Sequence, residues 1–233
     1  MFLYFLATNP FWASLSATLG NIVIHSSSRD FSIPGLILAN RAFTSAILLS
    51  SEKDVLIENY AGNSSRNIDL SENQSYPSDN IDGKEFINNM ITVGASTYNL
   101  DSNQVASFSN YGSKNVDVFA PGFQVYSSIL EGKFKYSNGT SMAAPQVSGV
   151  AAVLRSFYPK LSASSIKRIL LDSGINMNSK LKEPSSGNIL EPSVMSITGK
   201  TINLYNALIY ASIYKKNDPE GSLKKFKSKL LIK

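Results

Sequence analysis

Apolar residues along this chain fall into short runs bounded by Gly, Pro and polar residues, and into longer runs with helical spacing. The short runs are Val55–Ile57 and, between residues 90 and 129, the segments MITVGAS, VASFSNYG, VDVFAPG and VYSSI. Val and Ile between turn residues favour β-strands. The longer runs predict a helix over Asn40–Ser50 and a buried, Ala-rich helix over Ser141–Phe157.

The last third of the chain continues the alternation. Ser162 can cap a helix over SASSIKRILLDSG that stops at Gly174. Residues 176–198 are predicted to form a long loop, and GKTINLYNALIYASIYKK contains a final strand and helix. Strands that alternate with helices predict an α/β fold with a largely parallel sheet.

Composition narrows the class of protein. The 233 residues, 43% hydrophobic and 17% charged, suit one globular domain. Much of the net charge of +5 lies in residues 215–233, which we interpret as a solvated basic tail without a nucleic-acid or membrane partner. The absence of cysteine excludes disulfides, thiol catalysis and Cys-based zinc sites.

The N-terminal segment MFLYFLATNPFW is apolar, but no basic residue precedes the apolar run, and Asn9 and Pro10 interrupt it. It is too short for a membrane span and makes a poor signal peptide. We therefore favour a buried element of the core. A protein anchored in a membrane by residues 1–12 is the weaker alternative.

Candidate chemistry is concentrated in SNGTSMAAPQVSGVAAVL. Gly139 permits a tight turn, and Ser141 then lies in the first turn of the predicted helix. Free backbone N–H groups and the positive end of the helix dipole meet there, and they would stabilise an oxyanion formed at a carbonyl attacked by Ser141. A Gly-Thr-Ser helix start by itself is more typical of a simple helix cap.

The whole string NGTSMAAPQVSGVAA resembles the nucleophile segment of the subtilisin-like serine peptidases, the subtilases. This resemblance implies that Ser141 is the catalytic nucleophile. The upstream AGN resembles the oxyanion-hole segment of the family, which implies that Asn63 is an amide donor. ITVGAS, FSNYG and VDVFAPG follow in the order typical of the family.

The resemblance runs from about Glu52 to Ala211. It implies a subtilisin-like α/β fold, with helices on both faces of a mostly parallel sheet. Residues 1–40 then form a divergent or remnant segment, and residues 41–214 the C-terminal part of a subtilase catalytic domain. Parent proteins of this family are usually secreted or bound to the cell envelope, whereas the chain itself leaves its compartment undetermined.

Some residues depart from the family pattern. The strand before Asn63 carries Glu58, Asn59 and Tyr60 in place of small apolar residues, and Tyr60 would partly fill the specificity pocket. Asp117 matches a structural position of the family near a cation site, not the acid of the triad, so bound calcium is an expectation of the resemblance. Asn63 and SMAAP argue against the related sedolisins, which use a glutamate base and an aspartate in the oxyanion hole.

The sequence shows no residue that matches the general base of the family, which accepts the proton of the catalytic serine. In subtilases it is a histidine in an HGTHVAG-like segment, preceded by an aspartate. The single histidine here, His25, lacks a Gly-rich helix start after it, and residues 1–24 contain no acid. We interpret His25 as a surface or loop histidine. The predicted function is a serine endopeptidase domain for polypeptide substrates, lacking Asp and His, which a missing N-terminal half would carry. The alternative is a non-catalytic pseudopeptidase or peptide-binding remnant of the same fold.

Overall fold

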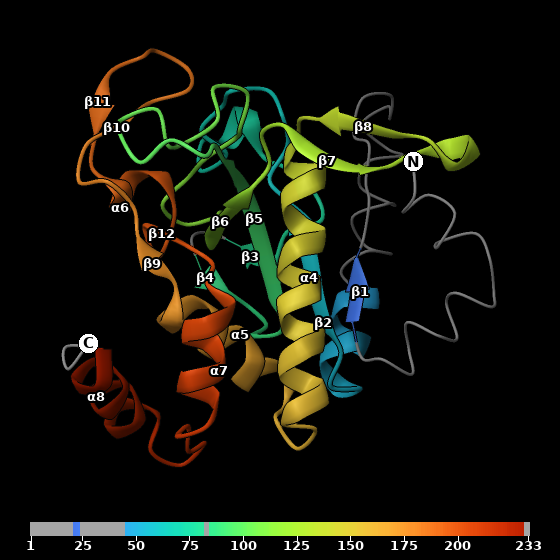
Figure 1. The fold of residues 1–233 in the computed structure, drawn as a ribbon, viewed down its shortest axis with the longest axis vertical. Coiled ribbons are helices and arrows are strands. Elements are labelled where there is room, and N and C mark those ends of the chain that lie inside the picture. Colours follow the sequence, from blue (N-terminus) through green and yellow to red (C-terminus); the bar gives the residue numbers. More distant parts are fainter. Residues whose placement is uncertain (1–20, 24–44, 82–83, 231–233) are drawn as a thin grey trace.

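The computed structural model describes residues 21–23, 45–81 and 84–230 (Figure 1). Within these residues, six strands form the central sheet in the order β1-β2-β5-β6-β12-β9. The strands are β1 (Asn21–Val23), β2 (Leu56–Tyr60), β5 (Met90–Ser96), β6 (Val118–Pro121), β12 (Lys200–Thr201) and β9 (Ile175–Asn176). All neighbours pair in parallel except β9 with β12. The prediction of a mostly parallel sheet is confirmed.

Helices cover both faces of this sheet, as predicted. They comprise a helix over 45–52, α4 (Thr140–Phe157), α5 (Ala163–Ser173) and α7 (Leu204–Ala211), whereas α8 (Pro219–Leu230) packs on α7. The long helix α4 lies across β2, β5 and β6 (Figure 1). Leu56 and Ile57 point to opposite faces because strand side chains alternate. Leu56 joins the core that contains α4, whereas Ile57 packs with Ile47 of the helix over 45–52.

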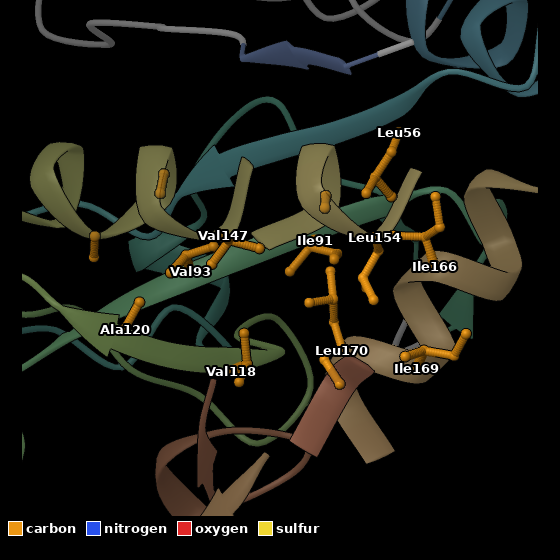
Figure 2. Packing of buried hydrophobic residues seen from close by; sticks show 14 of the residues in the cluster. Leu56, Ile91, Val93, Val118, Ala120, Val147, Leu154, Ile166, Ile169 and Leu170 are labelled. Atoms are coloured by element: carbon orange, nitrogen blue, oxygen red, sulfur yellow. The ribbon is translucent and has the colours of Figure 1, made fainter. Parts of the chain in front are cut away.

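The larger core lies between the sheet and the helices α4 and α5. Its apolar residues interdigitate as Figure 2 shows; they include Ile91 and Val93 of β5, Val118 of β6, Val147 and Leu154 of α4, and Ile166, Ile169 and Leu170 of α5. Alanines at 143, 144 and 151 are completely or almost completely buried in α4. Small side chains on this helix allow its backbone to run close to the strands.

Shorter elements lie outside the central sheet. They are β3 (Asn80–Ile81) with β4 (Lys84–Glu85), β7 (Val125–Ser128) with β8 (Phe134–Ser137), β10 (Leu181–Lys182) with β11 (Ile189–Leu190), the helix α6 (Pro192–Met195), and 3-10 turns at Ser71–Asn73 and Leu130–Gly132. The elements β10, β11 and α6 interrupt the segment predicted as a long loop. The strand predicted at VYSSI is present as β7.

One predicted strand is wrong. Residues 105–112, VASFSNYG, form turns and isolated bridges, with no strand longer than a bridge in this described segment. Ala106 N–H donates to Ala95 O of β5 (3.0 Å), but other backbone groups pair with the loop after β2: Ser65 N–H donates to Phe108 O (3.0 Å) and Tyr111 N–H donates to Arg66 O (3.0 Å). Tertiary contacts have overridden the β-propensity of the segment.

The basic C-terminal segment is largely a helix. The aromatic ring of Phe226 in α8 is buried and stacks on Tyr210 of α7, with ring centroids 5.0 Å apart. Lysines at 224, 225, 227 and 229 remain exposed on this helix. None of the helices in the described part of the chain is both long enough and apolar enough to cross a membrane.

Candidate functional site

The segment that contains Ser141 begins α4 where β5 and β6 end. Gly122 N–H donates to Ser96 O (2.9 Å), and Gly139 N–H donates to Gly122 O (2.8 Å), which ties the start of the helix to the ends of these strands. Gly139 is the residue before the helix and has φ +151°. A side chain there would also approach Asn63, because a Cβ would lie 3.3 Å from its Nδ2. Both facts favour glycine.

Asn63 lies on the loop after β2, directly against the start of α4. Its Oδ1 accepts hydrogen bonds from the N–H and from the hydroxyl of Thr140, both at 2.9 Å. Gly62 N–H donates to the same Thr140 hydroxyl at 3.2 Å. The two residues singled out in the sequence, Asn63 and Ser141, therefore lie on adjoining segments. Thr140 was not singled out, although its place between Gly139 and Ser141 in the motif was the available signal.

This arrangement can present two hydrogen-bond donors to one oxygen atom. In the first turn of α4, Thr140 N–H donates to Asn63 Oδ1 and Met142 N–H donates to Gly139 O (3.0 Å), which leaves the N–H of Ser141 as a donor. The Asn63 carboxamide keeps its NH2 while its oxygen accepts two hydrogen bonds from Thr140. Preorganised donors of this kind stabilise negative charge on an attacked carbonyl. Among residues 45–81 and 84–230, no side chain hydrogen-bonds the hydroxyl of Ser141. His25 lies outside the described residues.

The unusual residues of β2 have separate environments. Glu58 is completely buried against α4, where the Ser148 hydroxyl donates to Oε2 at 3.3 Å and Oε1 has no hydrogen-bond partner among the described residues. Burial raises the pKa of Glu58 to about 8. The Asn59 amide donates to Pro77 O at 3.0 Å. Tyr60 is half-buried beside the α4 core, and its role in a specificity pocket stays a prediction.

Asp117 faces a cation, and that cation is a lysine. The ammonium of Lys167 lies 3.2 Å from Asp117 Oδ1, 3.1 Å from Glu85 Oε1 and 3.6 Å from Asp79 Oδ2. Burial and the neighbouring Asp117 raise the pKa of Asp79 to about 7. Burial alone would lower the pKa of Lys167, but Asp117, Asp79 and Glu85 together raise it.

The described residues contain no group of three or more His, Cys, Asp or Glu arranged to hold a metal ion. The carboxylates around Lys167 already surround an ammonium, so they do not fit an additional calcium ion. Calcium binding at any other position stays a prediction of the family resemblance.

Comparison with known proteins decides the family. The model of the subtilase family matches residues 30–196, most of the chain. The chain belongs to the subtilase family. Curated relatives of this subtilase include subtilisin DY of Bacillus licheniformis, 44% identical over 89 residues, which are 38% of this chain and 31% of that protein. Another is alkaline serine exoprotease A of Vibrio alginolyticus, 42% identical over 81 residues, which are 35% of this chain and 14% of that protein.

Solved structures share the fold of this subtilase. A lanthipeptide protease superposes with a TM-score of 0.59 at 24% identity, covering 81% of this chain and 60% of that chain. A protease from Pseudoalteromonas arctica superposes with a TM-score of 0.57 at 23% identity, covering 82% of this chain and 51% of that chain. The matched regions thus span less than a third of the two curated relatives and 51–60% of these two structures.

Proposed function

We propose that this subtilase supplies the nucleophile and the oxyanion donors of a serine endopeptidase site, and that an Asp–His pair on another segment completes it. The observation that carries the proposal is the contact between the Asn63 carboxamide and Thr140, the residue before Ser141. This contact supports a role for the Asn63 NH2 as a donor to the carbonyl that Ser141 attacks.

The chemistry assigns a distinct task to each group. Ser141 Oγ forms a bond to the carbonyl carbon of a peptide, and its proton passes to the base. The carbonyl oxygen becomes an oxyanion that the Asn63 NH2 and the Ser141 N–H at the start of α4 stabilise. The base then protonates the amine that leaves, and water hydrolyses the acyl-enzyme. The substrate is a polypeptide, as the names of the protease relatives suggest.

Two observations on the chain's own residues support a base on another segment. The described residues offer no hydrogen-bonding partner to the Ser141 hydroxyl, and His25 lacks both the Gly-rich helix start and an upstream acid. The same observation favours the second candidate function, a non-catalytic protein of this fold that binds a peptide segment. The two functions differ in whether Ser141 becomes reactive when a base is supplied.

The test is labelling with a fluorophosphonate, in which Ser141 Oγ displaces fluoride from phosphorus. The chain alone should label barely, because removal of the histidine of subtilisin costs about 10⁶-fold in turnover. Fusion of the Asp- and His-bearing segment of subtilisin DY upstream should restore labelling. Ser141→Ala should then abolish it, whereas His25→Ala should leave it unchanged.

Two results would contradict the proposal. Strong labelling of the unaided chain that His25→Ala removes would make His25 the base. A fused chain that folds, binds peptide and still does not label would leave the non-catalytic peptide-binding function as the better account.

A further inference from the structure

Asn110 forms hydrogen bonds to the loop that carries Asn63. It is buried, with 7% of its surface exposed. Its Oδ1 accepts hydrogen bonds from Ser64 N–H and Arg66 N–H, both at 3.0 Å, and its Nδ2 donates to Ala61 O at 2.9 Å. One side chain thus binds three backbone groups that lie on both sides of Asn63.

We call these contacts between Asn110 and the loop over 61–66 the Asn110 clamp, and Gly62 is part of it. The backbone N–H of Asn110 donates to Gly62 O at 2.8 Å, which is a fourth bond to the same loop. Gly62 has φ +102°, and a Cβ at this position would lie only 2.5 Å from Asn110 Nδ2. The position of the Asn110 side chain therefore requires a glycine at position 62, although 48 positions separate the two residues (110 − 62).

Asn63 is held from two directions as a result. The residues before and after it are bonded to Asn110, and its own carboxamide oxygen accepts two hydrogen bonds from Thr140. The four bonds from Asn110 all end on the Asn63 loop. Fixing the backbone of a loop before a reaction removes the cost of ordering it during the reaction.

We propose that Asn110 is a positioning residue, which sets the direction of the Asn63 carboxamide relative to Ser141. This inference rests on the proposed role of Asn63 as an oxyanion donor. An asparagine suits the task because one side chain must both accept two N–H bonds and donate to a carbonyl. Asn110→Asp keeps the acceptors but places a carboxylate oxygen against Ala61 O, and Asn110→Ala removes all three side-chain bonds.

The kinetic test uses the chain fused to the Asp- and His-bearing segment of subtilisin DY. Asn110→Ala should lower the maximal rate of fluorophosphonate labelling about 10-fold or more, with the half-saturating probe concentration unchanged. Asn63→Ala should lower the rate about 10²- to 10³-fold, the loss known for an oxyanion donor of subtilisin. The double variant should be no slower than Asn63→Ala, because Asn110 acts through Asn63.

Asn89→Ala is the matched control. Asn89 is buried, and its amide donates to Ser50 Oγ of the helix over 45–52 (3.0 Å) and to O of Val55, the residue before β2 (2.6 Å). Its loss should lower stability without lowering the labelling rate of the folded protein. A purely structural role of Asn110 predicts the same behaviour for Asn110→Ala, and this result would overturn the inference.

A second readout needs no catalysis. In the unfused chain, Asn110→Ala should speed hydrogen exchange of the Ser64 and Arg66 amides and shift the NMR signals of the Asn63 side-chain NH2, with Asn110→Asp intermediate. Unchanged exchange and unchanged Asn63 signals would overturn the inference. If the fused wild-type chain fails to label, the proposed function fails, and these signals still decide whether Asn110 positions Asn63.

Discussion

Replacing Lys167 with methionine tests the buried ionic cluster that joins α5 to the residues before β6. The side chains of Lys167, Asp79 and Asp117 are 7%, 8% and 3% exposed, and that of Glu85 is 34% exposed. Lys167→Met keeps most of the volume but leaves two buried carboxylates without their cation. Removing one partner of a buried pair costs about 3–5 kcal/mol. That loss is a large part of the 5–15 kcal/mol by which domains are typically stable.

The loss should depend on pH in a defined direction. Without Lys167, the folded state should bind a proton at Asp79 more tightly than the unfolded state does, because Asp79 stays buried and loses its cation. Stability then falls as pH rises through the range between the unfolded and folded pKa values, and recovers as pH falls. Wild-type Asp79 already shows this sign, since its pKa is raised from 3.8 to about 7. The destabilisation by Lys167→Met should therefore be smaller at pH 5 than at pH 8.

The assay is urea unfolding at pH 5 and pH 8, with the free energy of unfolding taken from the midpoint and slope. Adding Asp117→Asn to Lys167→Met should recover part of the loss, because it removes one of the stranded carboxylates while an amide oxygen can still accept the hydrogen bond from Thr92 N–H. Lys133→Met is the surface control: its partner Glu131 is 77% exposed, so the change should stay within about 0.5 kcal/mol. A loss from Lys167→Met below about 1 kcal/mol, or one equal at both pH values, would refute the reasoning.

Two further predictions concern Glu58 and the β7–β8 ribbon. Because the pKa of Glu58 is raised from 4.5 to about 8, its contribution to stability should fall as pH rises from about 4.5 to 8. Glu58→Gln should therefore make the urea unfolding midpoint depend less on pH over this range. An unchanged pH dependence of the midpoint would contradict this prediction. In the ribbon formed by β7 and β8, Tyr126, Phe134 and Tyr136 are 61%, 60% and 68% exposed. Replacing all three with serine should lower the amount of bound dye that reports apolar surface. Phe157, at the far end of α4, is 69% exposed, and Phe157→Ser should leave the amount of dye bound by the ribbon unchanged.

The sequence by itself determined those helices and strands whose apolar residues follow a single helical or strand-like pattern. The apolar run MITVGAS became β5 within its predicted bounds, and the Ala-rich run from Ser141 to Phe157 became α4, extended by Thr140. Ser162 caps α5 as predicted, since its side chain accepts a hydrogen bond from Ser165 N–H. Gly174 ends α5 as predicted, with an extended backbone (φ −57°, ψ 156°) in a place where a Cβ would lie 2.9 Å from Thr201 O.

Tertiary structure alone decided the features that join distant residues. VASFSNYG has the composition of a strand, but beyond one bond from Ala106 N–H to β5 its residues 108–111 pair with the loop after β2. Nothing in the sequence near Asp117 indicates that its cation is Lys167, fifty positions later (167 − 117). The motif around Ser141 could be read from the chain because its chemistry is local. The clamp of Asn110 on the Asn63 loop could not, because a hydrogen bond between two loops leaves no periodic pattern in either.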